Sequence, residues 1–204
     1  IMPSRSAAVC EPIHTRTHKV SAHRRTFRNE DMYIVIDTEF TSLTRDAELL
    51  SLGAVSEDGR RFYCELEPVP LAACSDFVRR FVLPLCEGGA AVCPRVEFPA
   101  RLAGWLRQFT DPVLLVDSDW DIDVLHHALT GRRSRLPGLL QFTAAKAAHA
   151  VMLMTLAPFD GDELAVFERA VGQHYAADPR PHHALVDALA IAAGLQAVGA
   201  MHPG

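Results

Sequence analysis

The sequence lacks several features that define common classes of protein. It has no Gly-rich phosphate loop and no Gly-x-Ser-x-Gly elbow, which removes two main catalytic classes. Its five cysteines are odd in number and form no Cys-x-x-Cys pair, as suits a reducing cytoplasm. The start has no continuous apolar segment of a secretory signal, and polar residues interrupt every long apolar run before it could span a bilayer. We therefore expect a soluble, cytoplasmic protein with no membrane partner.

Positive charge is also scarce. The chain has 20 Lys and Arg against 25 Asp and Glu, a net charge of -5, which argues against holding long nucleic acid mainly by neutralising phosphates. Residues 1–31 contain six of the basic residues and three of the acidic ones, which leaves 14 basic against 22 acidic residues in the rest. If this acidic part touches nucleic acid, metal ions are expected to mediate the contact.

The length and composition predict one well-buried domain. The chain has 204 residues, of which 49% are hydrophobic. Residues 1–31 mix Ser, Thr, His and Arg without periodicity, and we interpret them as an N-terminal extension that is flexible or artificially added. A basic tail that contacts nucleic acid is the alternative. The domain is expected to cover 32–204.

The hydrophobic pattern predicts an α/β fold. Two apolar runs flank the turn signal Asp58-Gly59 and indicate a hairpin, which forms an antiparallel three-strand meander with the strand before it. Strands are expected at 33–40, 48–55, 61–66 and 112–117, with a strand or helix end at 151–156. Helices are expected at 75–85, 99–109, 119–129, 161–176 and 183–198. This order indicates a mixed sheet, the meander plus parallel strands, with helices on both sides.

Carboxylates follow two of these strands. Asp37 and Glu39 lie at i and i+2, so they share a face at the end of the first strand. A hard divalent ion such as Mg²⁺ or Mn²⁺ prefers oxygen ligands and relieves the repulsion of such a pair. The second strand leads into Asp117, Asp119, Asp121 and Asp123, and any of the four could be a further ligand if the strand continued. We favour Asp121, because Leu125 one helical turn later would anchor that turn in the core.

Three spaced motifs give the chain a family resemblance. They are Asp37-Thr38-Glu39-Phe40 at a strand end, Trp120-Asp121 with Leu125 at a strand-to-helix junction, and His182-His183-Ala184 with Asp187-Ala188 at the start of the last helix. In this order the motifs resemble those of the DEDDh 3′-5′ exonucleases, most closely the small exoribonuclease-like branch, over residues 32–198. The resemblance implies a ribonuclease H-like fold and two divalent metal ions.

The resemblance also implies a role for each matching residue. Asp37 would bridge both ions, Glu39 and Asp187 would complete one site, Asp121 would hold the other, and His182 would be the general base. His182 precedes Asp187 by five residues, about 140° around a helix, so we expect His182 on the loop before the helix. Phe40, Leu43 and Trp120 are candidates for binding the terminal nucleotide.

The expected activity is hydrolysis of single-stranded RNA from its 3′ end to nucleoside 5′-monophosphates. The preference for RNA comes from the resemblance alone. A DNA exonuclease of proofreading or repair type is the first alternative, and a catalytically inactive nucleic-acid-binding module of the same fold is the second. A homodimer is possible, because dimers are common among proteins of this kind.

Overall fold

The computed structural model describes residues 32–135, 138–142, 149–156 and 159–202, so the predicted extension at 1–31 lies outside the described residues. The strands are β1 (Met32–Phe40), β2 (Leu49–Ser56), β3 (Arg61–Glu67), β4 (Val92–Pro94), β5 (Pro112–Val116), β6 (Gly138–Phe142) and β7 (His149–Thr155). The α-helices are α1 (Phe98–Leu106), α2 (Asp119–Thr130), α3 (Gly161–Ala177) and α4 (Ala184–Ala197). Shorter helical turns are η1 (Leu71–Ala73), η2 (Val78–Val82), η3 (Leu83–Leu85) and η4 (Gly89–Ala91).

The strands form one mixed sheet in the order β4-β3-β2-β1-β5-β7-β6. β1, β2 and β3 pair antiparallel, which confirms the predicted meander. β5 lies parallel to β1 and to β7, so the two strands that carry acidic ends are neighbours and end at the same edge of the sheet. The α/β class with a mixed sheet between helices is confirmed.

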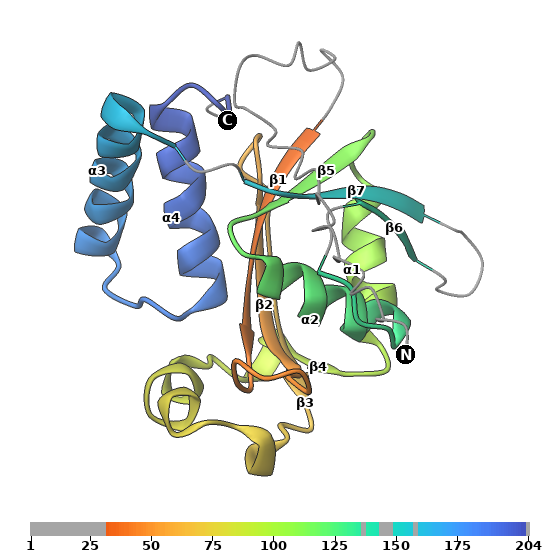
Figure 1. Cartoon of the computed structure of the whole chain (residues 1–204). Helices are drawn as coiled ribbons and strands as arrows, with labels where there is room; N and C mark the ends of the chain where they lie inside the picture. Colours follow the sequence, from red (N-terminus) through yellow and green to blue (C-terminus); the bar gives the residue numbers. More distant parts are fainter. Residues whose placement is uncertain (1–31, 136–137, 143–148, 157–158, 203–204) are drawn as a thin grey trace, which may run out of the picture.

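Helices cover both faces of the sheet, as Figure 1 shows. Successive side chains of β1 alternate between two cores, as a pleated strand requires. Ile34 and Ile36 join the core under α1 and α2, whereas Tyr33 and Val35 join the core under α4. α3 packs on the outside of α4, where the ring of Phe167 lies against Gly194. The end of β1 therefore lies between two layers of helix.

One predicted segment differs from the structure, and the structure decides a second one that the sequence left open. The expected regular helix at 75–85 is instead a π-helical turn, η2, followed by the 3-10 turn η3. Its apolar residues Val78 and Val82 are still buried, against Leu50 and Cys74. The spacing of apolar residues therefore predicted which side of the segment is buried, but not the type of helix. In the segment at 151–156, left open between a strand and a helix end, residues 151–155 belong to β7, which pairs antiparallel with β6.

Among the residues that the structure describes, no helix combines the length and the apolar character that crossing a bilayer requires.

Candidate active site

The last residues of β1 form the floor of the site. Asp37 and Glu39 are half-buried on the face that carries α4, and Thr38 points to the opposite face, where it is buried. The N-terminus of α4 approaches this point closely because Gly53, the β2 partner of Asp37, has no side chain. A Cβ atom on Gly53 would lie 2.3 Å from backbone atoms of Ala184 and Leu185. The glycine thus allows the third motif to lie beside the first.

The helix α2 brings Asp121 to the same place. Ser118 caps this helix by accepting a hydrogen bond from the Trp120 N–H, which starts the helix before Asp121 and ends the strand-like alternation of the aspartates. The buried Asp121 Oδ1 accepts hydrogen bonds from the Thr38 hydroxyl at 2.5 Å and the Thr38 N–H at 3.2 Å. Thr38 therefore connects the second motif to the first.

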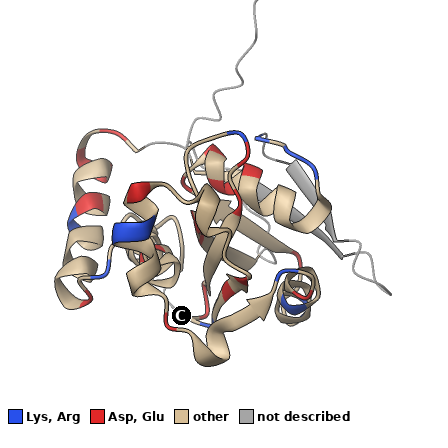
Figure 2. Cartoon of the chain, turned by 90° about the horizontal axis from the view of Figure 1, so that it is seen from below, with Lys and Arg blue, Asp and Glu red and all other residues tan. Residues whose placement is uncertain are grey.

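The other three aspartates of this region have different surroundings. Asp117, at the end of β5, interacts with Asp121. Asp119 accepts a hydrogen bond from the Thr155 hydroxyl at 2.9 Å, and Asp123 forms ion pairs with arginines on another side of α2. Figure 2 shows the acidic first turns of α2 in red. Of the four, Asp121 and Asp117 lie near Asp37, which agrees with the choice of Asp121 without testing its role.

Asp187 comes from the first turn of α4. Its Oδ1 accepts a hydrogen bond from the Tyr175 hydroxyl of α3 at 2.8 Å, and its Oδ2 accepts one from the His182 N–H at 2.9 Å. Each donor holds one oxygen of the carboxyl group and so orients it. The structure thus brings all four predicted carboxylates, Asp37, Glu39, Asp121 and Asp187, into one cluster, which we call the acid cluster.

The acid cluster strongly disfavours its own ionisation. Burial raises the pKa of Asp37 well above its usual value, and the charges of Asp121, Glu39 and Asp187 raise it further. Burial, with the charges of Asp187 and Asp121, raises the pKa of Glu39 to about 8. Burial also raises the pKa of Asp187, although its hydrogen bonds from Tyr175 and His182 oppose the shift. Carboxylates that lie this close together can all be ionised at neutral pH only if a cation lies among them.

The Lys and Arg side chains in the described part of the chain do not meet this need. Among the residues that the structure describes, none of the four carboxylates pairs with Lys or Arg. The Oδ2 atom of Asp37 is buried and has no hydrogen-bond partner there, although a buried acceptor without a partner is costly. One ligand atom each from Glu39, His182 and Asp187 lie within 4.8 Å of one another. An oxygen-rich donor set with a free buried oxygen fits a hard divalent ion.

The two adjacent histidines differ sharply in environment. His182 lies on the loop before α4, as expected, and is exposed with a left-handed φ of 70°, a strained conformation for a residue other than glycine. His183 is 2% exposed, stacks on Tyr63 with ring centroids 4.6 Å apart, and lies 3.2 Å from Glu87 Oε1. The side chain of His182 is therefore accessible to solvent, whereas His183 is part of the packing.

The segment that contains η1 to η4 lies near the end of β1 (Figure 1), and its Phe77 contacts His182. Buried Glu65 holds this segment by accepting hydrogen bonds from the N–H groups of Glu87 and Gly88. The exposed ring of Phe77 lies edge-on to His182, 4.9 Å between centroids. His182 is thus flanked by an aromatic side chain that the sequence alone did not assign to the site.

Two of the three candidate nucleotide contacts, Phe40 and Trp120, lie on the side of β1 that carries α2. Phe40 follows Glu39 directly and stacks on Trp120, with ring centroids 6.0 Å apart and an angle of 20° between the planes. Leu43 is 71% exposed. Phe40 also packs against the core, so part of its ring serves the fold. A role for these residues in nucleotide binding stays a prediction.

No family model matches this chain, and the search of curated proteins finds no relative.

Sequence reasoning missed three residues that position the acid cluster. Thr38 orients Asp121, Tyr175 orients Asp187, and Gly53 allows α4 to approach β1. Each acts across a sequence separation of 12 residues or more, so no local pattern could have indicated its partner. Only for Gly53 was there a signal, because a glycine inside a strand often marks a close approach of another backbone.

Proposed function

We propose that this protein is a metal-dependent 3′-5′ exonuclease that removes nucleoside 5′-monophosphates from single-stranded RNA. The observation that carries the proposal is the acid cluster, in which four carboxylates from β1, α2 and α4 converge without a Lys or Arg partner among the described residues. Its motif order resembles that of the DEDDh exonucleases, whose ribonuclease H-like fold is compatible with the observed sheet. The preference for RNA, and a possible homodimer, rest on that resemblance.

The four carboxylates would hold two divalent ions, Mg²⁺ or Mn²⁺. Asp37 would take part in holding them, because it lies near Asp121, Glu39 and Asp187 and its buried Oδ2 has no hydrogen-bond partner among the described residues. Such ions, when bound, lower the pKa of a coordinated water and stabilise negative charge on a leaving oxygen. Thr38 and Tyr175 keep Asp121 and Asp187 in the orientation that binding requires.

His182 is the proposed general base. Its backbone N–H is held by Asp187 Oδ2 while its side chain is exposed beside the cluster, so a ring nitrogen can accept a proton from the attacking water. The unperturbed pKa of histidine lies near neutrality, which favours proton transfer at physiological pH. Phe77 packs against the ring edge-on and limits its motion on one side.

The test is hydrolysis of labelled RNA and matching DNA oligonucleotides, each with a free or a blocked 3′ end, in Mg²⁺, Mn²⁺ or chelator. We expect stepwise shortening of RNA from a free 3′ end that stops in chelator. Asp37→Asn should lower the rate at least about a thousandfold, roughly 4 kcal/mol, because it removes charge from both metal sites at nearly constant volume.

Two results would count against the proposal. Hydrolysis that continues in chelator, or an Asp37→Asn variant within about tenfold of the parent rate, would refute the two-metal reading. If DNA is hydrolysed faster than RNA, the proposed two-metal mechanism stands, but the proposed substrate changes from RNA to DNA.

A further inference from the structure

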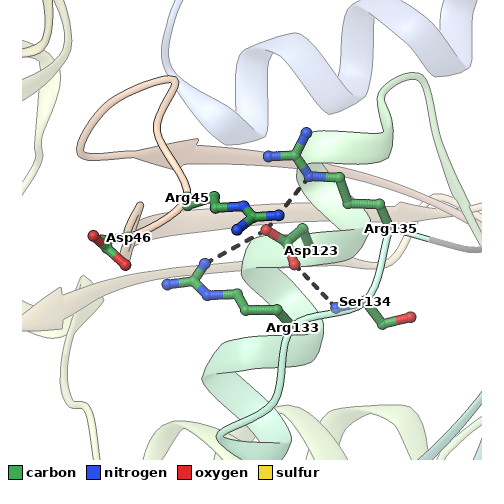
Figure 3. A pocket seen from close by; sticks show the side chains of 6 residues that line it. All are labelled: Arg45, Asp46, Asp123, Arg133, Ser134 and Arg135. Carbon is green, nitrogen blue, oxygen red and sulfur yellow. Dashed lines mark hydrogen bonds and ion pairs between the residues drawn. The ribbon is translucent and has the colours of Figure 1, made fainter.

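A second charged site lies on α2, away from the acid cluster. It is a cavity of about 580 Å³ lined by Arg45, Asp46, Asp123, Arg133, Ser134 and Arg135, which we call the arginine pocket. Figure 3 shows the three guanidinium groups gathered around Asp123, with Asp46 at the edge of the group. The arginines come from two loops, one after β1 and one after α2, so the pocket exists only in the folded chain.

Buried Asp123 organises two of the three arginines. Its Oδ2 lies 3.6 Å from Nη1 of Arg133 and 3.7 Å from Nε of Arg135, and its Oδ1 accepts a hydrogen bond from the Ser134 N–H at 3.0 Å. Asp123 is 3% exposed, whereas the side chains of Arg133 and Arg135 are 31% and 43% exposed. Asp123 thus holds the loop in place and leaves the outer N–H groups of the arginines open.

Arg45 supplies charge that the fold does not use. Within the described part of the chain its guanidinium has no ion pair or hydrogen bond, although it points toward the same cluster in Figure 3. Three guanidinium groups therefore face one buried carboxylate. A purely structural ion pair would need only Arg133 or Arg135, so Arg45 indicates an anion from outside.

An aromatic stack connects this pocket to the acid cluster. The Arg135 guanidinium carbon lies 3.6 Å from the centroid of the Trp120 ring, and Trp120 stacks on Phe40. Phe40 follows Glu39 in β1, and Trp120 precedes Asp121 in α2. In Figure 2 the segment after α2 is blue beside the red first turns of that helix. A ligand held at the acid cluster can therefore extend over the stack to the arginines.

We propose that the arginine pocket binds a backbone phosphate of the nucleic-acid strand, upstream of the 3′ end that lies at the acid cluster. That the ligand is a nucleic-acid strand rests on the proposed function, whereas the preference for an anion rests on the arginines of the pocket. Planar guanidinium groups match the oxygens of a phosphate in a bidentate manner, and several from different loops define one position for it. The pocket would then favour substrates longer than a dinucleotide.

The test uses the full chain in chelator, where binding is measured without hydrolysis. Fluorescence anisotropy of a short 5′-labelled RNA gives Kd for the parent, Arg45→Ala and the control Arg169→Ala, an exposed arginine of α3. Arg45→Ala should weaken binding about tenfold at low salt, lower the slope of log Kd against log salt by about 0.7, and leave folding intact. Arg169→Ala should change neither quantity, and Arg45→Lys should recover part of the loss.

The outcomes separate this proposal from the catalytic one. If Arg45→Ala binds RNA with the parent's affinity and salt dependence, the pocket proposal is wrong even where hydrolysis is observed. If RNA is not hydrolysed but its binding still depends on Arg45, the pocket stands and the exonuclease proposal falls. Competition with inorganic phosphate shows whether the bound anion is free phosphate or a phosphate of the RNA backbone. If phosphate binding requires Arg45 but RNA binding does not, the proposal that the pocket binds a nucleic-acid strand is wrong.

Discussion

Asp121 and Asp123 lie two residues apart on α2 and are equally buried, each 3% exposed, yet their surroundings are opposite. Asp123 has Arg133 and Arg135 beside it and a backbone N–H on its second oxygen. Asp121 has the hydroxyl and N–H of Thr38 and the charges of other acids. A carboxylate that serves the fold is buried together with its own cations, because an uncompensated buried charge is costly.

The cost is visible in the ionisation of Asp121. Burial raises its pKa to about 7, and the nearby Asp117 adds to the shift, although the hydrogen bonds from Thr38 oppose it. The protein therefore holds one carboxylate without a cationic partner among the described residues and, two residues later on another side of the same helix, a carboxylate paired with arginines. Under the proposed function, Asp121 would bind a cation from solution, whereas Asp123 is already paired with arginines of the protein.

The largest expected effect comes from removing the negative charge of Asp121 or of Asp123 by substitution with Asn. Asp121→Asn should lower the rate of RNA hydrolysis about a thousandfold, because a proposed ligand is lost, without lowering the thermal stability of the metal-free protein. Asp123→Asn should keep most of the activity on a dinucleotide and lose about 1–2 kcal/mol of stability, since its two arginines lose their partner but stay partly solvated. Hydrolysis rates and denaturant unfolding measure both effects.

The contrast between Asp121 and Asp123 is contradicted if the two variants behave alike. Equal loss of activity in both, or loss of stability in Asp121→Asn as large as in Asp123→Asn, would mean that the surroundings of the two carboxylates do not separate function from fold.

A smaller effect is expected from the neighbouring histidines, which contrast in the same way. His182→Ala should lower kcat by about 10²–10⁴-fold and change the pH profile, with metal binding nearly unchanged. His183→Ala should keep the pH profile and lose about 1–3 kcal/mol, because it leaves a gap against Tyr63. Should His183→Ala be the inactive variant and His182→Ala keep its profile, the register of the third motif, and with it the role of Asp187, would be wrong.

The smallest effect concerns the stability of the metal-free protein as the pH changes. The folded-state pKa of Glu39, about 8, exceeds its ordinary value of 4.5, so between these limits the folded protein binds more protons than the unfolded chain. Stability should therefore fall as the pH rises through this window. Thermal unfolding in chelator should show a Tm lower by a few degrees at pH 8 than at pH 6, and Mg²⁺ or Mn²⁺ should reduce the difference.

Asp121→Asn is the matched variant for this measurement, because it removes one of the charges that raise the pKa of Glu39. Its profile should be flatter than that of the parent, whereas Asp123→Asn should follow the parent. A parent profile that is flat in chelator over this range would show that the acid cluster is not strained by its own charge.

Local signals in the sequence predicted much of the fold. Asp58-Gly59 between two apolar runs gave the hairpin of β2 and β3, and the change of period after Asp117 gave the start of α2, where Ser118 is the cap. The same reasoning placed His182 before α4. It failed at Val78–Val82, where the spacing of apolar residues is compatible with more than one helical winding and contacts with Leu50 and Cys74 accompany the π form.

By itself, the sequence determined which residues carry acid at strand ends, because strand and helix periodicity depends on near neighbours and the side-chain direction follows from it. Only the tertiary structure decided how far each carboxylate is compensated. The sequence favoured Asp121 as a ligand but did not show that Asp123 is paired with arginines or that Arg45 faces the same pocket, because the loops and strands that surround these residues come from distant parts of the sequence. The charge of a site depends on neighbours in space, and those are set when the sheet and its two layers of helix pack together.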